Sequence, residues 1–267
     1  MKVLSIDSSS NICGVSILDD ENLICNLDED TGRTHSENLM PMVDNAFKKS
    51  NLSLKDIDLI VCDIGPGSFT GIRIGVATAK GFHDSLNIPL VGINSLEALA
   101  YNLRNDIDDN SLVLSIIDCK NENCYFALFE KNVELFRTLI EPQSDSIEST
   151  LSIIKTYIED NFSAIPPIYV IGDGSKIYED KIKDFFENST ISNINFVTDK
   201  NNLLNSYSLG IAGVKHFSNY SCEEEVLPLY LKKPQAQRQL EEKIKINFIW
   251  KEFIWILKIL KFLRWIL

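Results

Sequence analysis

The stretch GPGSFTGIRIGVATAKGF, residues 65–82, contains five of the chain's twelve glycines and follows the apolar run 57–64. Such a run is typical of a strand that is buried on both faces. Glycines after a buried strand can hold phosphate, but Gly71 is followed by an Ile-Arg pair where a phosphate loop needs Lys-Ser or Lys-Thr. The spacing of the glycines also differs from the dinucleotide fingerprint. We therefore expect a turn at Pro66 and then a helix to about Leu86.

Small residues form one stripe along this predicted helix, because Gly71, Gly75 and Ala79 recur every four positions. Each helical glycine costs up to about 1 kcal/mol relative to alanine, so two on one stripe need a reason. A second helix that approaches closer than the usual distance of about 8–10 Å would supply one. That helix is either the one expected at 36–49 or one from another chain. In the second case, Gly75→Leu should disrupt pairing and leave the monomer folded.

The rest of the chain repeats one pattern twice. Three short apolar runs, at 2–7, 12–18 and 22–27, predict consecutive strands. A helix at 36–49, a strand at 57–64, a helix within 65–86, a strand at 88–93 and a helix at 95–104 follow them. The second set is similar, with strands at 112–117, 125–130 and 133–139, a helix at 145–160, a strand within 166–174 and a helix at 175–187. This order predicts an α/β fold with two lobes, each a mixed sheet of βββαβα type flanked by helices. The polar segment 106–110 separates a first lobe, 1–105, from a second, 106–228.

The duplicated order resembles the superfamily of actin, sugar kinases and heat-shock ATPases. In that superfamily ATP lies between the lobes, and backbone N–H groups in the first hairpin of each lobe hold its phosphates. The resemblance makes nucleotide-binding candidates of Asp7, Ser9, Asp118, Gly172 and Gly174. Each also has a structural explanation, since a carboxylate can cap the end of a strand and a Gly-Asp-Gly sequence can form a turn.

A narrower resemblance rests on five segments, namely 65–82 together with IDSSS (6–10), HSENLMP (35–41), SLEALA (95–100) and PLYLKKPQAQRQLEEK (228–243). With these segments the chain resembles the TsaB (YeaZ-type) family over residues 1–243. The resemblance implies a subunit without catalysis of its own and without a tightly bound cofactor. It implies pairing with a homologous catalytic TsaD-like paralogue and with a TsaE-like ATPase, and ATP and Mg would be used by these partners. The assembly forms N6-threonylcarbamoyladenosine beside the anticodon of tRNAs that read codons starting with A.

The family's pairing surface lies on helices of the first lobe, and TsaB-like chains also form homodimers through it. Carried onto this sequence, the resemblance gives these partner-binding candidates: His35, Leu39, Met42, Val43, Phe69, Thr70, Gly71, Ile72, Gly75 and Ala79.

The histidines predict no metal site. The resemblance implies that the catalytic paralogue carries two histidines at i and i+4 on its first helix, where both face one metal ion. Here His35 is followed by Leu39, and no HExxH string occurs. We therefore expect no catalytic residues. Two other functions stay open, an ATP-dependent enzyme of the sugar-kinase type that uses the interlobe cleft and, less favoured, an M22-type peptidase.

Charge and cysteine content limit the partners and the compartment. The net charge is −12, which argues against a chain that grips nucleic acid alone, so we expect tRNA to be reached through a partner. The six cysteines include no CxxC pair and are expected to be reduced. The first residues become polar too early for a secretory signal, which predicts a cytoplasmic protein.

The end of the chain departs from the family. Residues 229–243 complete the resemblance, whereas 244–267 contain all three tryptophans, five Lys or Arg residues and one acidic residue. Lys251, Lys258, Lys261 and Arg264 gather on one side of a helical wheel, which predicts a basic amphipathic tail. Its uncharged runs are much shorter than the ~20 residues of a membrane span. It is either a surface-lying helix or the product of a changed reading frame near Lys243.

Overall fold

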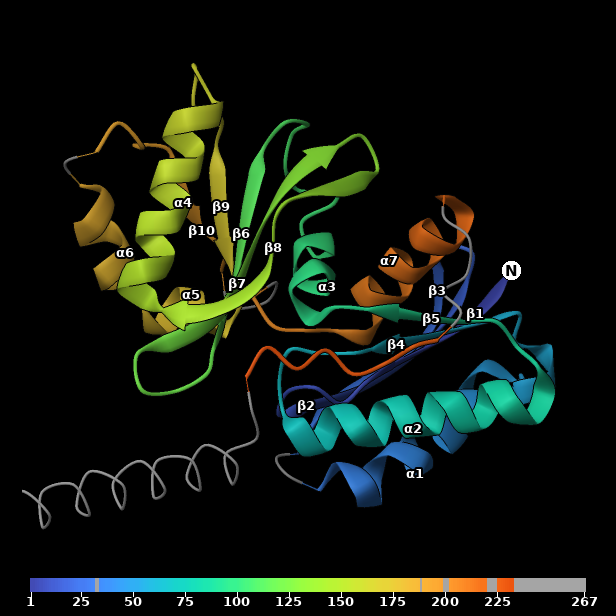
Figure 1. The fold of residues 1–267 in the computed structure, drawn as a ribbon. Helices are drawn as coiled ribbons and strands as arrows, with labels where there is room; N and C mark the ends of the chain where they lie inside the picture. The colour runs from blue at the N-terminus through green and yellow to red at the C-terminus, as the bar shows by residue number, and fades with distance from the viewer. Residues whose placement is uncertain (32–33, 188, 199–201, 220–224, 233–267) are drawn as a thin grey trace, which may run out of the picture. The chain divides into compact units, whose positions relative to one another are not determined.

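The computed structural model describes residues 1–31, 34–187, 189–198, 202–219 and 225–232 (Figure 1). The chain divides into two units, Met1–Leu231 and Lys232–Leu267. The expected tail at 244–267 and most of the segment 229–243 lie outside the described residues. The fold described below is that of the first unit.

Five strands form the first sheet, in the order β3-β2-β1-β4-β5. Their bounds are β1 Lys2–Asp7, β2 Ile12–Asp19, β3 Asn22–Asp30, β4 Leu59–Asp63 and β5 Leu90–Ile93. The first three strands pair antiparallel, and β4 and β5 extend the sheet in parallel with β1. All five residues of β4 are buried, as the continuous apolar run predicts for a strand covered on both faces.

The second sheet repeats this topology, since its order is β8-β7-β6-β9-β10. Its strands are β6 Leu112–Asp118, β7 Asn123–Asn132, β8 Leu135–Ser146, β9 Ile168–Ile171 and β10 Ile194–Phe196. Again three strands pair antiparallel and two extend the sheet in parallel. The predicted duplicated α/β architecture is therefore confirmed.

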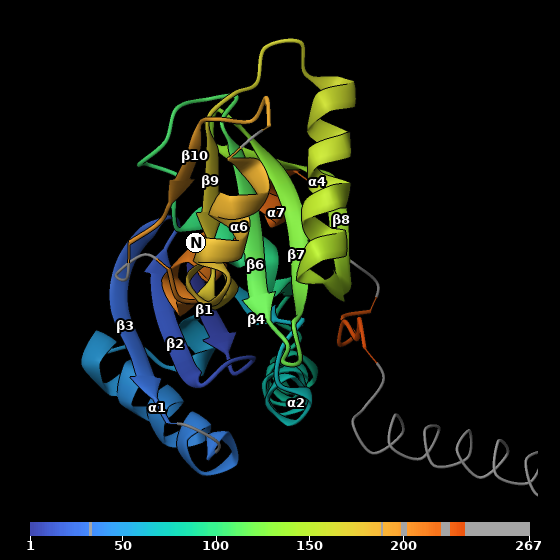
Figure 2. The ribbon, with the colours of Figure 1, turned by 90° about the vertical axis from the view of Figure 1, so that its left-hand side faces the viewer.

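The helices lie in three layers around the two sheets (Figures 1 and 2). They are α1 His35–Ser50, α2 Phe69–Leu86, α3 Ser95–Tyr101, α4 Ile147–Asn161, α5 Asp173–Ile177, α6 Glu179–Phe186 and α7 Ser206–Asn219, with a short 3-10 turn at Leu54–Asp56. One apolar core joins α1 and α2 to the first sheet, and another joins α4 and α6 to the second. The third core lies between the sheets and is built around α3 and α7.

Helix α7 packs on the first sheet although its residues fall in the range expected for the second lobe. A Cβ atom on Gly210 would lie 2.8 Å from Leu18 Cδ1, and one on Gly213 would overlap the side chain of Val61. These glycines let the helix backbone lie directly on β2 and β4. Residues 225–231 also return to the first sheet, because Val226 is buried in its core. Segment 106–228 therefore contributes to both lobes.

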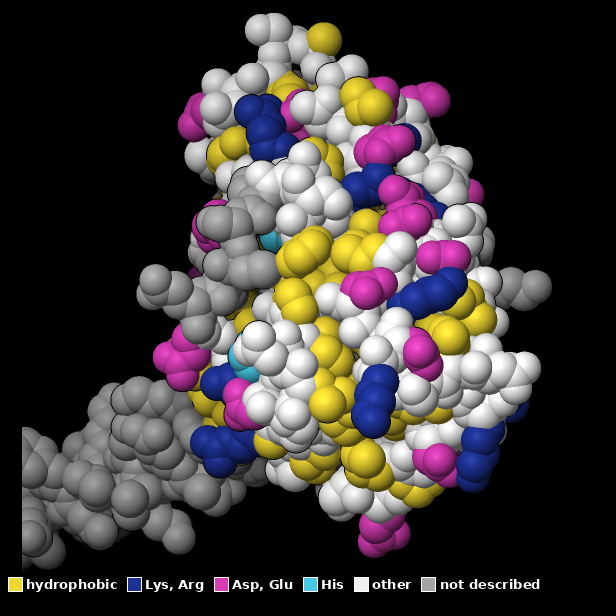
Figure 3. Space-filling model, turned by 90° about the vertical axis from the view of Figure 1, so that its right-hand side faces the viewer, with side chains coloured by type: hydrophobic (Ala, Val, Ile, Leu, Met, Phe, Trp, Pro, Cys, Tyr) yellow, Lys and Arg dark blue, Asp and Glu magenta, His cyan; other side chains and the backbone are white. Residues whose placement is uncertain are grey.

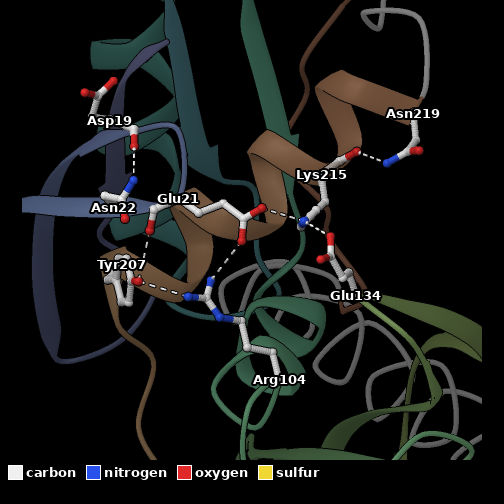
Figure 4. Close-up of polar contacts among 8 residues, drawn as sticks. All are labelled: Asp19, Glu21, Asn22, Arg104, Glu134, Tyr207, Lys215 and Asn219. Atoms are coloured by element: carbon white, nitrogen blue, oxygen red, sulfur yellow. Dashed lines mark hydrogen bonds and ion pairs between the residues drawn. The ribbon is translucent and has the colours of Figure 1, made fainter.

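Polar side chains join the two halves beside α7 (Figure 4). The Lys215 ammonium forms ion pairs with Glu21, in the β2–β3 turn, and with Glu134, in the β7–β8 turn. Arg104, just after α3, donates from Nη2 to Tyr207 Oη over 2.9 Å, and Tyr207 donates to the Glu21 carbonyl over 3.0 Å. One network thus links both sheets to α7.

Apolar side chains exposed on the described surface are distributed over many elements rather than over one. Figure 3 shows one face, on which hydrophobic side chains gather in a band through the middle and charged side chains lie mostly beside it. The large exposed apolar residues are Leu23, Ile24, Met40, Leu86, Val133, Ile177, Leu203, Leu227 and Tyr230. Within the described ranges, no helix has the length and apolar character that a bilayer crossing requires.

Candidate functional site

Two aspartates are the last residues of neighbouring parallel strands in the first sheet, so they lie side by side where these strands end. Asp7 ends β1 and Asp63 ends β4, and the strands pair in parallel from Val3 with Leu59 onward. The carboxyl ends of parallel strands are the usual place for a site in an α/β sheet. Both side chains are buried, with exposed fractions of 1% and 2%.

Ser9 connects the two carboxyl groups. Its backbone N–H and its hydroxyl each lie 2.8 Å from Asp7 Oδ1, and the same hydroxyl lies 3.1 Å from Asp63 Oδ2. Asp63 Oδ1 accepts hydrogen bonds from the Gly65 N–H and, over 2.7 Å, from the Ser95 hydroxyl. The Asp7–Asp63 pair, with Ser9 and Ser95, therefore fixes the turn that precedes α2.

Burial decides the acidity of both carboxyl groups. It raises the pKa of Asp7 to about 6 against the opposing hydrogen bonds from Ser9, and the charge of Asp28 adds to the rise. Burial also raises the pKa of Asp63 well above its ordinary value, and the neighbouring Asp7 charge raises it further. The pair thus favours a protonated state at pH values where exposed aspartates are ionised.

The glycine stripe of α2 faces a turn of its own chain rather than another helix. A Cβ atom on Gly67 would overlap the carbonyl oxygen of Ser9, and one on Gly71 would overlap that of Ser8. A Cβ atom on Gly75 would lie 2.6 Å from Ser8 Oγ, which donates to the Gly71 carbonyl over 2.9 Å. The expectation of a helix against the whole stripe is therefore wrong, although α1 borders Gly71 through His35.

Eight of the ten expected partner-binding residues are buried within this chain. They lie in or beside the core between α1, α2 and the first sheet: His35, Leu39, Met42, Val43, Gly71, Ile72, Gly75 and Ala79. Their side chains pack within this chain and leave little surface for a partner, so in the described structure they support the two helices. The remaining two differ, since Thr70 is exposed and Phe69 is half-buried.

The outer face of α2 combines the expected Thr70 with three residues that the sequence reasoning missed. Thr70, Arg73, Ala77 and Gly81 are all exposed and share one side of the helix. A Cβ atom on Gly81 would have no neighbour within 4 Å. The same helical spacing that identified the glycine stripe could have identified this opposite face.

Arg73 joins the start of α2 to the segment 225–231. Its guanidinium carbon lies 3.8 Å from the centre of the Phe69 ring, and its Nε donates to Tyr230 Oη over 2.8 Å. The two rings are 4.8 Å apart, so the cation and both aromatic groups form one stack. No spacing rule in the sequence connects positions so far apart.

The imidazole of His35 is engaged inside the chain. Its Nε2 lies 2.8 Å from the Ser10 carbonyl oxygen and its Nδ1 lies 3.1 Å from Thr31 Oγ1. A ring with both nitrogens in hydrogen bonds offers none to a metal ion. Among the residues that the structure describes, no group of three or more His, Cys, Asp or Glu side chains is placed to hold a metal.

The second-lobe candidates form a separate cluster around Asp118. Burial opposes the ionisation of this carboxyl group, but hydrogen bonds from Lys120 and Tyr178 prevail and lower its pKa. The Asp118 N–H donates to Asp173 Oδ1 over 2.9 Å. A Cβ atom on Gly174 would lie 2.5 Å from Ile116 Cγ2, and one on Gly172 would overlap the Ile116 carbonyl. Both glycines therefore permit close packing on β6, and no described contact joins this cluster to Asp7 and Ser9.

Comparisons with known proteins give a consistent picture. The family model TsaD, described as tRNA N6-adenosine threonylcarbamoyltransferase, matches residues 27–240. The Bacillus subtilis protein named tRNA threonylcarbamoyladenosine biosynthesis protein TsaB is 29% identical over 184 residues, which cover 69% of this chain and 76% of that relative. A protein of the same name from Buchnera aphidicola subsp. Baizongia pistaciae is 27% identical over 239 residues, or 86% of this chain and 97% of the relative.

A solved structure shows the same fold. YeaZ from Pseudomonas aeruginosa superposes with a TM-score of 0.69 at 19% identity, covering 86% of this chain and 99% of that one. At this identity the likeness concerns the fold alone. Together with the curated relatives, it confirms the resemblance predicted from the five sequence segments.

Proposed function

We propose, because this chain belongs to the TsaD family of tRNA N6-adenosine threonylcarbamoyltransferases, that it takes part in tRNA threonylcarbamoyladenosine biosynthesis as a TsaB-type subunit without catalysis of its own. The match over residues 27–240 carries the proposal. The curated relatives support the TsaB-type assignment, since proteins from several bacteria bear that name.

The contacts in the first lobe favour a scaffold role over a catalytic one. The position four residues after His35 is Leu39, which is buried in the core, and the His35 ring is held by Ser10 and Thr31. In the second lobe, the turn after Asp118 carries the Lys120 side chain, whose ammonium group pairs with Asp118 over 2.8 Å. Both arrangements satisfy the polar groups within the chain. We infer that metal and ATP chemistry belongs to partner subunits.

The outer face of α2, made of Thr70, Arg73, Ala77 and Gly81, is the surface we assign to the partner. Small residues at 77 and 81 allow the backbone of another helix to approach closely. A TsaD-like catalytic paralogue is the proposed occupant, and a second copy of this chain would use the same face. A TsaE-like ATPase would join this pair, and tRNA would be reached through the partners.

Co-purification tests the pairing. Tagged wild-type chain should retain a co-expressed TsaD-like protein, whereas Gly81→Arg should retain at least tenfold less, because the long cation occupies the face. The variant should fold, since a Cβ atom at this position would meet nothing within 4 Å beyond the adjacent backbone of its own helix. Gly81→Ala and Thr156→Arg, the latter on the exposed side of α4, are the controls.

Different failures have different meanings. Full retention by a folded Gly81→Arg chain would reject this face but not the family role. If the wild-type chain itself retained no TsaD-like protein, with or without TsaE-like protein, ATP and tRNA, the scaffold function would be wrong. Binding of Mg-ATP by the isolated chain in calorimetry would instead favour the ATP-dependent enzyme.

A further inference from the structure

The Asp7–Asp63 pair has too few hydrogen atoms if both groups are ionised. The Ser9 hydroxyl carries one hydrogen but lies within hydrogen-bond distance of Asp7 Oδ1, at 2.8 Å, and of Asp63 Oδ2, at 3.1 Å. It can donate to only one of them. The Ser95 hydroxyl lies closer to Asp63 Oδ1, at 2.7 Å, than to Ser9 Oγ, at 3.4 Å, and the Gly65 N–H is also directed to Asp63 Oδ1. One of the two carboxylate oxygens next to Ser9 would therefore lie against the Ser9 hydroxyl oxygen with no hydrogen atom between them.

We propose that Asp63 holds a proton on Oδ2 and that this proton completes the chain Asp63 Oδ2–H to Ser9 Oγ and Ser9 Oγ–H to Asp7 Oδ1. The two bonds then run in one direction, and each hydroxyl hydrogen has one acceptor. A proton on Asp7 Oδ2 would have no acceptor, since that buried atom has no hydrogen-bond partner among the described residues. A proton on Asp7 Oδ1 could reverse both bonds, but that oxygen already accepts the Ser9 N–H over 2.8 Å, and burial together with the Asp7 charge raises the pKa of Asp63 well above its ordinary value. Both observations assign the proton to Asp63. The site is thus a buried binding site for one proton, and it stands independently of the proposed function.

The charges around the pair favour proton uptake. Asp28 of β3 raises the pKa of Asp7, and Asp7 raises that of Asp63. From β2, the Cys13 thiol stays neutral at physiological pH, because burial and then Asp7 raise its pKa to about 12. From α1, His35 hydrogen-bonds to the Ser10 carbonyl instead of to either carboxyl group. Helix α3 contributes the Ser95 hydroxyl and the turn before α2 contributes the Gly65 N–H. No described cation pairs with Asp7 or Asp63.

The proton has a structural consequence for the turn before α2. The Ser9 carbonyl accepts the Ser68 N–H over 2.6 Å, and the Gly65 carbonyl accepts the Ser95 N–H over 2.9 Å. Loss of the proton would place two charges in the buried pair and would repel Asp63 from Ser9 and Asp7. The start of α2 is therefore linked to the protonation of Asp63.

The sign of the pH effect follows from the raised pKa. Above pH 4, unfolded Asp63 is ionised while folded Asp63 keeps its proton, so folding takes up a proton and stability falls as pH rises. This dependence ends where pH exceeds the folded pKa. Asn at position 63 mimics the protonated acid, since its Oδ1 can accept from Gly65 and Ser95 while its Nδ2 donates to Ser9. The variant should lack this pH dependence.

Urea unfolding of the full chain between pH 4.5 and pH 8 tests the proposal with wild type, Asp63→Asn and the exposed control Asp44→Asn. Relative to Asp63→Asn, the wild-type unfolding equilibrium constant should increase by up to tenfold per pH unit. Asp44→Asn should follow the wild type. An Asp63→Asn chain whose stability deficit grows with pH would overturn the proposal, because it would show that the native group is a carboxylate.

A measurement on the wild-type chain decides the question even if Asp63→Asn does not fold. With carbon-13 in the aspartate carboxyl groups, the Asp63 resonance should keep the chemical shift of a protonated acid at pH 7. A carboxylate shift at pH 7, or a titration at the ordinary aspartate pKa of about 3.9, would overturn the proposal.

Discussion

The ammonium group of Lys215 in α7 lies 2.5 Å from the carboxylate of Glu21 in the β2–β3 turn. The same ammonium pairs with Glu134 in the β7–β8 turn, so a single side chain connects the two sheets through α7 (Figure 4). Lys215 is mostly buried, with a side-chain exposed fraction of 12%. Its carboxylate partners are more exposed, at 41% for Glu21 and 71% for Glu134, so solvent still screens both pairs in part.

Lys215→Met should lower the free energy of unfolding by about 1 kcal/mol, because two carboxylates lose their common partner while the apolar stem is kept. Lys183→Met, which removes an exposed pair with Glu179 on α6, should cost less than Lys215→Met. Urea unfolding at low salt measures both. Equal losses in the two variants would show that the Lys215 network adds nothing beyond a surface ion pair.

Gly75→Ala should lower the free energy of unfolding by about 1–3 kcal/mol, the range for overpacking a well-packed interior. The added Cβ atom would lie 2.6 Å from Ser8 Oγ and would displace the hydroxyl that donates to the Gly71 carbonyl. For the same reason Gly75→Leu should prevent folding instead of blocking only a partner. Thermal and urea unfolding measure the loss.

Gly81→Ala is the matched control on the same helix. Its Cβ atom would meet no neighbour within 4 Å, and alanine is the better helix former, so this change should add up to about 1 kcal/mol. If Gly75→Ala were as stabilising as Gly81→Ala, the close approach of the Ser8 turn to α2 would be disproved.

The repeated order of strands and helices could be predicted because most elements have either one buried face or two. Each case leaves a recognisable pattern of apolar residues in the sequence. Helix α1 buries Leu39, Met42, Val43 and Ala46, which recur at helical spacing, so its period was visible. The bounds of helix α7 were not predicted, because it lies in the core between both sheets and has apolar residues and glycines around much of its circumference. Strand β10, with three residues, is too short to produce a pattern.

The candidate site was predictable only in part. Asp7 is the last residue of an obvious strand, but its link to Asp63 depends on the parallel pairing of β1 and β4, which spacing does not reveal. The glycine stripe was found, yet its meaning was not, because small residues serve equally for a helix and for a turn that approaches the backbone. Only the positions of Ser8 and Ser9 decide between the two.

Tyr230→Ala should loosen the attachment of the segment 225–231 to the first lobe. The phenol ring contacts Phe69 and its hydroxyl accepts from Arg73, while the neighbouring Leu229 N–H donates to the Ile64 carbonyl over 2.7 Å. The Leu229 amide should therefore exchange its hydrogen about tenfold faster in the variant, if the stack stabilises the segment by about 1.4 kcal/mol. Leu227→Ala, at a side chain with 55% exposure, should leave this amide unchanged. Unaltered exchange in Tyr230→Ala would show that Val226, buried in the core, holds the segment without help from the aromatic stack.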